Sequence, residues 1–162
     1  MSASACTIKM GMNPRLSIID LAIDPIGNGR GRIAIDRTLA TPLMIALGSD
    51  RRAEPDDVVP EMLTAPPGTA APLLSRRGFP GDVLLSDGER YGCRMWLLSR
   101  AGNTETTRVA AAGYGAEAVA PIESYHGVTI DVVASWYDRA RGVLQVTATQ
   151  SGQSVGTRVT VL

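Results

Sequence analysis

The sequence predicts an α+β fold with an N-terminal β-hairpin, central helices with a long irregular loop, and a C-terminal three-stranded antiparallel meander. Two β-rich runs flank a glycine-rich turn near the N-terminus, and three more follow one another across residues 128–161. Helical patterns lie between these two groups, and strands and helices do not alternate regularly. That segregation is typical of α+β architectures and argues against a doubly wound parallel sheet.

The first predicted element is a hairpin that follows a lead-in. Residues 1–15 are predicted to be a flexible lead-in, and residues 16–162 a single domain, since a chain of this length can bury one core. The apolar runs Ile18–Ile23 and Ile33–Ile35 flank the turn Gly27–Gly31. Two such runs around glycines and an asparagine predict a β-hairpin.

A short helix is predicted directly after the hairpin. Thr41 offers a capping hydroxyl, and Pro42 follows it at the first helical position, where a missing N–H is harmless. Apolar residues come next, and Gly48 is expected to end the helix.

Residues 49–88 are predicted to form a long irregular loop within the domain. They contain a series of residues that break helices and strands: Pro55, Pro60, Pro66, Pro67, Pro72 and Pro80. A loop of this length in a compact domain is commonly functional or disordered. Because it also carries apolar side chains, we expect it to lie against the body of the domain or against a neighbouring protein.

Two further helices are predicted after the loop. The first covers Tyr91–Arg100, where apolar side chains recur at helical spacing. The second begins with Asn103 as N-cap and runs to about Ala120; Pro121 ends or kinks it, and Gly127 marks the exit from the helical region. A stripe of small side chains is expected to form its packed face: Val109, Ala112, Gly113, Ala116 and Ala120.

The last third of the chain reads as β-structure. Alternating apolar residues in Val128–Val132, Val143–Thr149 and Val155–Val161 are separated by the turn signals Asp138–Gly142 and Ser151–Ser154. Three consecutive strands joined by short turns predict an antiparallel meander.

Composition limits the classes of function that the chain can serve. Apolar residues make up 44% and charged residues 20%, with a formal net charge of zero, so bulk charge favours neither nucleic acid nor an anionic membrane. The N-terminus lacks the apolar segment of a signal peptide, and no apolar run is long enough to span a bilayer. Cys6 and Cys93 are predicted to be reduced thiols, because they are too few and too distant for a thiolate metal site.

No motif in the sequence indicates catalysis, so the chain is predicted not to be an enzyme and to carry no metal or cofactor. A Cys93–His126 nucleophile pair would need both groups in one cleft, and a helix-exit position explains His126 better. The remaining candidates for a hydrolase or a metal site are acidic residues in or near the loop: Asp50, Glu54, Asp56, Asp57 and Asp82. No spacing forces any two of them together, and arginines lie beside them.

Two arginine pairs in the loop, Arg51-Arg52 and Arg76-Arg77, form the most informative charged group. Lys9 is the single lysine of the chain, so the other cations are guanidinium groups, which pair well with carboxylates at buried contacts. The residues alone leave three readings open: solvated ion pairs, pinning of the loop to its own domain, or docking on another subunit. Phosphate binding is weaker, because the neighbouring acids would oppose it.

Three motifs occur in order along the chain and carry a family resemblance. They are an Asp-Arg-Arg-Ala motif followed by acids, an arginine–glycine–aromatic element ending in Gly-Asp, and a Gly-x-Arg-x-Trp-Leu-Leu-x-Arg motif: Asp50–Asp57, Arg76–Asp82 and Gly92–Arg100. In this order and spacing they resemble the Mu-like bacteriophage baseplate wedge family, which is related to the sheath-initiator wedge proteins of contractile tails. The resemblance covers nearly the whole chain. Two departures stand out: Phe79-Pro80 replaces two expected tryptophans, and Glu61–Leu74 looks like an insertion.

The resemblance implies a structural subunit of a tail baseplate that joins neighbouring wedge proteins and helps to initiate the sheath. Its partners would be other wedge proteins, the tail hub and tube, and sheath subunits, with several copies around the tail axis. Its place would be the virion tail baseplate, after synthesis in the host bacterial cytoplasm. The residues expected to bind partners are Asp50, Arg51, Arg52, Arg76, Arg77, Gly78, Phe79, Gly81 and Asp82. Those expected to form the structural core beneath them are Gly92, Arg94, Trp96, Leu97 and Leu98.

Two readings from other classes stay open beside this one. A tail-associated, lysozyme-like hydrolase of the cell wall would need an essential carboxylate in a cleft. A free adaptor or regulatory binding domain outside any virion would need only an exposed binding surface.

Overall fold

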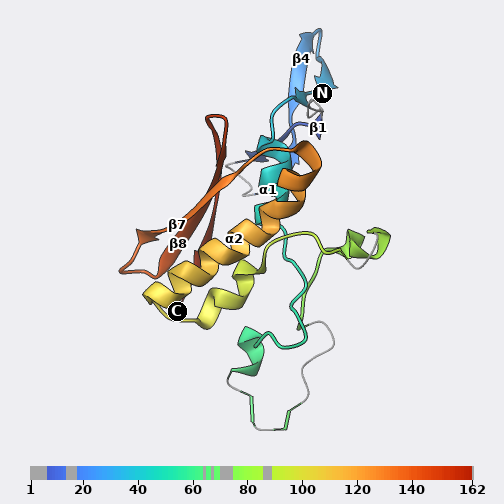
Figure 1. The fold of residues 1–162 in the computed structure, drawn as a ribbon. Helices are drawn as coiled ribbons and strands as arrows, with labels where there is room; N and C mark the ends of the chain where they lie inside the picture. Colours follow the sequence, from blue (N-terminus) through green and yellow to red (C-terminus); the bar gives the residue numbers. More distant parts are fainter. Residues whose placement is uncertain are drawn as a thin grey trace.

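A computed structural model describes residues 7–13, 18–63, 65–66, 68–69, 75–85 and 89–161 (Figure 1). Predictions made for residues 1–6, 14–15, 70–74 and 86–88, including the Cys6 thiol, lie outside these ranges. The described part confirms the α+β class, with strands at both ends of the chain and helices between them. Within that part, no helix combines the length and apolar character needed to cross a bilayer.

The C-terminal half is a helix packed on a three-stranded sheet. Strands β7 (Asp131–Asp138), β8 (Val143–Gln150) and β9 (Gln153–Thr160) pair antiparallel in the order β7-β8-β9, which confirms the predicted meander. Helix α2 (Glu105–His126) lies along the sheet (Figure 1). Alternate side chains of β8 are buried in the core, as expected for a sheet with one covered face: Leu144, Val146 and Ala148.

The start of α2 and its course through Pro121 differ from the sequence prediction. The N-cap is Thr104, whose Oγ1 accepts a hydrogen bond from the Thr107 backbone N–H at 3.2 Å, while the Asn103 amide instead donates to the carbonyl of Arg139. The helix also continues through Pro121 to His126, because proline removes one hydrogen bond without ending a helix that is packed along its length. Gly127 then ends the helix in the left-handed region at φ 62°, as predicted.

The buried face of α2 is not the predicted stripe. Val109 is 57% exposed, and Gly113, Ala116 and Ala120 also face outward. The face that packs on the sheet and on the central segments consists of Thr107, Ala111, Gly115, Ala118, Val119 and Ile122. Alanines occur on all sides of this helix, so the apolar pattern did not define a unique face.

The first helix, α1 (Ala40–Gly48), contributes Leu43, Ala46 and Leu47 to the same core. Thr41 is not its N-cap, because Leu39 occupies that position without a side-chain hydrogen bond. Thr41 instead lies in the first turn, where its N–H and its hydroxyl both donate to Oδ2 of Asp36, at 3.0 and 2.7 Å. Gly48 is the last residue of the helix, as predicted.

The N-terminal segment forms three two-stranded ribbons that meet at one junction. Strands β1 (Thr7–Ile8) and β6 (Ile35–Asp36) pair, as do β2 (Met10–Asn13) with β3 (Ile18–Leu21), and β4 (Ile23–Gly27) with β5 (Arg30–Ile33). The β4–β5 ribbon is a hairpin at the predicted place, with its turn at Asn28-Gly29 inside the predicted turn Gly27–Gly31. Most of the apolar runs predicted to form its strands pair elsewhere, Ile18–Leu21 with β2 and Ile35–Asp36 with β1. Residues 7–13, predicted as part of a flexible lead-in, are strands, because later segments of the chain supply their hydrogen-bonding partners.

Backbone hydrogen bonds join the three ribbons at Lys9, Ala22 and Ala34. The Lys9 N–H donates to the Ala34 carbonyl at 2.8 Å, and the Ala22 N–H to the Lys9 carbonyl at 2.9 Å. The Ala34 N–H closes the triangle on the Ala22 carbonyl at 2.9 Å. Each of the three chain segments therefore pairs with both others.

The predicted helix over Tyr91–Arg100 is a shorter 3₁₀ helix, η3 (Arg94–Arg100). Gly92 prevents an earlier start, since its φ of +105° is unfavourable for a residue with a side chain. Cys93 is extended instead and pairs with the Asp50 region, where its N–H donates to the Ser49 carbonyl at 2.8 Å. In the described part of residues 49–88, the predicted irregular loop contains only short 3₁₀ turns, η1 (Pro60–Met62) and η2 (Pro80–Leu84).

Candidate functional site

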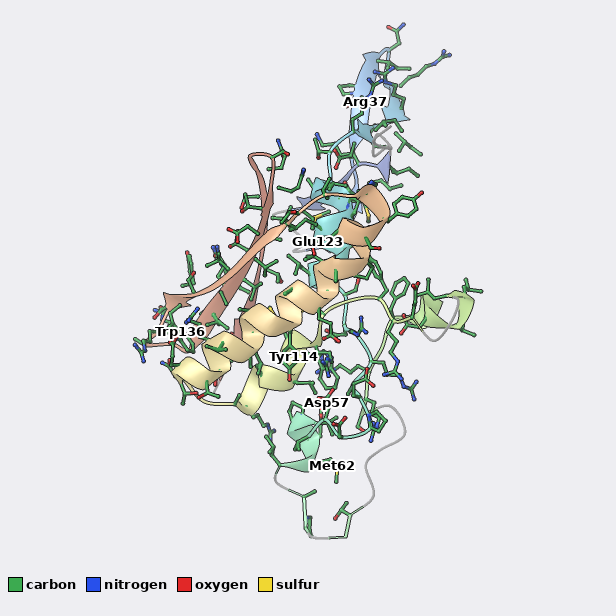
Figure 2. The ribbon with its side chains drawn as sticks, in the orientation of Figure 1. Arg37, Asp57, Met62, Tyr114, Glu123 and Trp136 are labelled. Carbon is green, nitrogen blue, oxygen red and sulfur yellow. The ribbon has the colours of Figure 1, made fainter. Side chains whose placement is uncertain are left out.

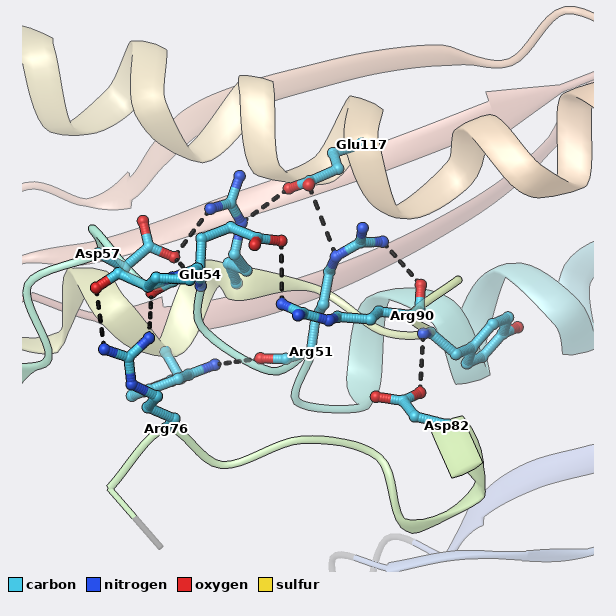
Figure 3. A network of polar contacts seen from close by, with 11 residues as sticks. Arg51, Glu54, Asp57, Arg76, Asp82, Arg90 and Glu117 are labelled. Atoms are coloured by element: carbon cyan, nitrogen blue, oxygen red, sulfur yellow. Dashed lines mark hydrogen bonds and ion pairs between the residues drawn. The ribbon is translucent and has the colours of Figure 1, made fainter. Parts of the chain in front are cut away.

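Hydrogen bonds join the two halves of the loop between residues 53–55 and Arg76, a region called the stem below. The Ala53 N–H donates to the Arg76 carbonyl at 2.9 Å, and the Arg76 guanidinium donates to the carbonyls of Glu54 and Pro55 at 2.7 and 2.8 Å. Figure 3 shows Arg76 beneath Glu54 and Asp57. This predicted partner-binding residue is therefore engaged within its own chain, as one of the three open readings anticipated.

Arg51 connects the stem to α2 and to the segment before η3. Its guanidinium donates to the Arg90 carbonyl at 2.7 Å, and its Nε lies 3.5 Å from Oε1 of Glu117 (Figure 3). Its backbone carbonyl accepts a hydrogen bond from Nε1 of Trp96 at 2.9 Å. Because its side chain is only 16% exposed, Arg51 holds the loop in place and offers little surface to a partner.

Arg94 is the centre of this polar network. Its Nε donates to Oε2 of Glu117 at 2.9 Å, and its Nη1 to Oδ2 of Asp57 at 2.8 Å. The guanidinium also stacks on the Tyr114 ring, 4.9 Å from the centroid. Burial opposes the charged form, but the hydrogen bonds to Asp57 and Glu117 outweigh it and raise the pKa of Arg94 above its usual value.

The polar network around Arg94 joins the long loop, through Asp57, to one face of α2, through Glu117. Figure 2 places Asp57 and Tyr114 next to each other between the loop and α2. A further ion pair joins Arg90 Nη1 to Glu54 Oε1 at 3.1 Å. Beneath it lies a small apolar cluster of Ala53, Val59, Trp96 and Leu97. Of the predicted structural-core residues, Trp96 and Leu97 lie in this cluster under the loop that carries the arginine pairs, called the arginine loop below. Leu98 is buried in the main core, and Arg94 is half-buried.

Gly92 fixes how closely the two segments approach. A Cβ atom at this position would lie 2.7 Å from the Ser49 carbonyl oxygen and 2.8 Å from the Arg51 nitrogen. A glycine is thus required both for its φ and for the close packing of the backbone. The position belongs to the framework and not to the exposed surface.

Arg77 and Asp50 form the outer layer of the site. Arg77 Nη1 lies 2.8 Å from Asp50 Oδ2, with the two side chains 43% and 45% exposed, so the ion pair alone contributes little to stability. The Arg77 guanidinium also stacks on the Trp96 ring at 4.7 Å. Gly78, at φ +127°, then turns the chain close to the Cβ of Arg52.

An exposed apolar knob follows this turn on η2. Val83 and Leu84 are 84% and 86% exposed, and Phe79 is 38% exposed beside them. Figure 1 shows this segment projecting from the body as the green turn beyond α2. Arg52 is exposed next to it, and no side-chain partner of Arg52 occurs among the residues that the structure describes. Arg52, Phe79 and Val83 line an open hollow together with Arg77, Gly78 and Asp82.

Asp82 and Gly81 hold the knob in its orientation. Oδ1 of Asp82 accepts the Tyr91 N–H at 3.0 Å (Figure 3), and the Phe79 ring packs against the Tyr91 ring at 5.8 Å. A Cβ at Gly81 would lie 2.4 Å from the Phe79 ring, so glycine allows that ring to fold over the turn. Val83 and Leu84 were not among the partner-binding residues predicted from the sequence, although two aliphatic residues directly after a Pro-Gly-Asp turn could have indicated an exposed apolar contact.

The groups considered for catalysis have structural contacts. The Cys93 thiol is buried and donates to the Tyr114 carbonyl, and burial raises its pKa to about 11, which disfavours the nucleophilic thiolate. His126 lies in the last turn of α2 with its ring 4.9 Å from that of Tyr125. Within the described ranges, no group of three or more His, Cys, Asp or Glu residues is arranged to hold a metal ion.

Comparison with known proteins gives two matches. The family model described as "Phage protein GP46" matches residues 39–155, from the residue before α1 into β9, including the whole arginine loop. "Baseplate protein gp46" of Escherichia phage Mu is 39% identical over 99 residues. That alignment covers 57% of this chain and 60% of the phage Mu protein, so the chain spans about three fifths of its relative's length.

Proposed function

The chain belongs to the phage protein GP46 family, and from this premise we propose that it is a structural, non-enzymatic component of a contractile-tail baseplate. Its finer role is that of a wedge subunit, which joins neighbouring baseplate proteins and helps to initiate the sheath. Its partners are other wedge proteins, hub or tube proteins and sheath subunits, with several copies around the tail axis. It is made in the host bacterial cytoplasm and resides in the virion tail baseplate.

The observation that carries this proposal is the exposed knob on a rigidly held loop. Val83 and Leu84 are almost fully exposed on a turn whose orientation is held by Asp82 and by the Phe79–Tyr91 contact. Exposed aliphatic side chains that are held in place mark protein–protein contact sites, since their burial on binding is favourable at about 25 cal/mol per Å². Arg52 beside them supplies a charge that can pair with a carboxylate of the partner.

The arginine pairs thus divide into two roles. Arg51 and Arg76 are directed into the chain and fix the loop, whereas Arg52 faces outward and Arg77 covers Trp96. We therefore place docking on Arg52, Phe79, Val83 and Leu84, with the inward arginines as their support. The partner-binding residues predicted from the sequence thus divide into an outward-facing layer that docks and an inward-facing layer that supports it.

The test compares a double variant with a single-substitution control in phage particles. Val83→Asp with Leu84→Asp should leave the thermal stability of the isolated subunit unchanged and should abolish its incorporation into baseplates. Val109→Asp, at a valine exposed on the outer side of α2, is the matched control and should assemble normally. Mass spectrometry of purified particles and electron microscopy of sheath length give the readout. Full-length sheathed tails from the knob variant would refute the docking role, and absence of the native chain from particles would refute the baseplate role.

A second assay addresses the enzymatic alternative. Purified protein is expected to leave peptidoglycan intact, because Asp50, Glu54, Asp57 and Asp82 are all engaged in ion pairs or hydrogen bonds. Clearing that disappears in an Asp56→Asn or Asp50→Asn variant would show that the chain is a hydrolase.

A further inference from the structure

The β4–β5 ribbon lies outside the residues that match the family model, and among the described residues no helix or further strand covers it. Every residue of both strands is exposed, and the ribbon extends away from the body in Figure 1. Ile23, Ile26 and Ile33 are 56%, 59% and 46% exposed. A two-stranded ribbon with exposed isoleucines is marginally stable in water, whereas a third strand or a packed face makes it stable.

The two edges of the ribbon differ in their ability to accept another strand. β4 contains Pro25, which has no N–H to donate, and its register shifts between Pro25 and Gly27. Prolines and irregularities of this kind block edge-to-edge pairing. β5, with the sequence Arg-Gly-Arg-Ile over residues 30–33, has neither feature. Its edge is the one that can extend the sheet.

The two faces of β5 have different chemistry. Arg30 and Arg32 alternate with Gly31 and Ile33, so both guanidinium groups lie on one face of the ribbon. On the other face the Ile23 side chain lies over Gly31, where a Cβ would be 2.3 Å from Ile23 Cγ2, and Ile23 stands opposite Ile33. One face of this edge is therefore cationic and the other aliphatic.

The cationic face has more positive charge than its own chain balances. Arg32 lies 3.7 Å from Asp24 across the ribbon, in a pair that is largely exposed. For Arg30, the described residues supply no ion-pair partner, and Arg37 is likewise exposed at the base of the ribbon (Figure 2). A strand placed beside β5 would be stabilised by carboxylates facing these arginines, since opposite charges on neighbouring strands contribute roughly 0.2–1 kcal/mol per pair.

We infer that the β5 edge receives an extended segment of a neighbouring baseplate subunit as a third strand. The segment alternates acidic side chains, which face Arg30 and Arg32, with aliphatic side chains, which cover Ile23 and Ile33. Main-chain hydrogen bonds supply the pairing, and the alternation sets the register. This inference rests on the proposed baseplate function and adds to it a second contact, apart from the knob on η2.

Hydrogen exchange on the unaltered protein tests the pairing without any variant. Of the amides of residues 30–33, those that point away from β4 should exchange rapidly in the isolated subunit and about tenfold or more slowly in purified baseplates. Amides of β8 at the centre of the meander provide the internal reference, because they are paired in both states. Equal exchange of residues 30–33 in the two states would overturn the inference.

Charge variants and cross-linking test the chemistry of the partner. Arg30→Glu with Arg32→Glu should reduce incorporation into particles at least tenfold, whereas Arg30→Lys with Arg32→Lys should retain it. A photo-cross-linking residue at position 30 should capture, in assembled baseplates, a peptide of another subunit with alternating acidic and aliphatic residues. Capture of a second copy of this chain, of a helical segment or of nucleic acid would overturn the proposal. If the chain is absent from baseplates, the proposed function fails; if it is present with an unprotected β5, only this inference fails.

Discussion

Replacing Asp36 by asparagine should destabilise the protein by about 2 kcal/mol at neutral pH, and the loss should vanish in acid. The Asp36 carboxylate accepts four hydrogen bonds, from the N–H and the hydroxyl of both Thr38 and Thr41, at 2.6–3.0 Å. It is buried at 7% exposure where the β-ribbons meet α1. An amide of the same size can accept only part of this set.

The magnitude follows from the pKa of this group. Burial alone would raise the pKa of Asp36, but the hydrogen bonds from Thr38 and Thr41 outweigh it and lower the pKa from 3.8 to about 2. Since one pKa unit corresponds to about 1.4 kcal/mol, ionised Asp36 stabilises the folded state by roughly 2 kcal/mol. Because the folded pKa is the lower one, this stabilisation is complete above about pH 4 and is lost as the pH falls through about 2.

Urea denaturation of native protein and Asp36→Asn at pH 7, 5, 3 and 2 measures the effect. The difference in free energy of unfolding should stay near 2 kcal/mol at pH 7 and 5 and fall to a few tenths at pH 2. Asp131→Asn, at an exposed aspartate of β7, is the control and should change stability by less than about 0.5 kcal/mol. A difference that persists unchanged at pH 2, or that is below 0.5 kcal/mol at pH 7, would show that ionised Asp36 does not stabilise the fold.

Three further predictions concern the core and the polar network. In α2, Gly113→Ala should stabilise by about 0.5–1 kcal/mol, because that site is open. Gly115→Ala should destabilise by roughly 1–3 kcal/mol, since its Cβ would lie 2.7 Å from Val146, and equal shifts in melting temperature would contradict this packing. Cys93, in a Cys6→Ser background, should resist iodoacetamide at pH 8 until the protein unfolds, because burial raises its pKa to about 11; rapid labelling of folded protein would refute its burial. Arg94→Ala should lower stability by about 3 kcal/mol by removing the arginine partner of Asp57 and one of the two arginines at Glu117, and a calorimetric change within error would rule out the network as a structural element.

The sequence was most informative where local chemistry determines structure. Alternating residues and glycine turns predicted the meander and the β4–β5 hairpin, and prolines predicted the irregular loop. Gly127 and Gly48 were placed correctly because helix ends depend on nearby residues. These signals all act over a few positions of the chain.

The errors arose where distant residues decide the outcome. Thr41 looked like a helix cap, but Asp36 recruits it within the first turn. Asn103 looked like the cap of α2, yet its amide bonds the turn after β7, and Thr104 takes that position. The framework of the arginine loop depends on contacts 23 and 37 residues apart, between Arg94 and its two carboxylates, which local patterns do not encode.

The stem of the arginine loop has an evolutionary consequence. The Arg76 side chain donates a hydrogen bond to the carbonyl of Glu54, 22 residues earlier in the chain, so the residues between them form a closed loop. Doubling the length of such a loop costs only about 0.6 kcal/mol in chain entropy. The length of the segment from Glu61 to Leu74 can therefore change at little entropic cost while the stem stays closed. At this site the sequence of the chain can diverge without loss of the subunit's fold.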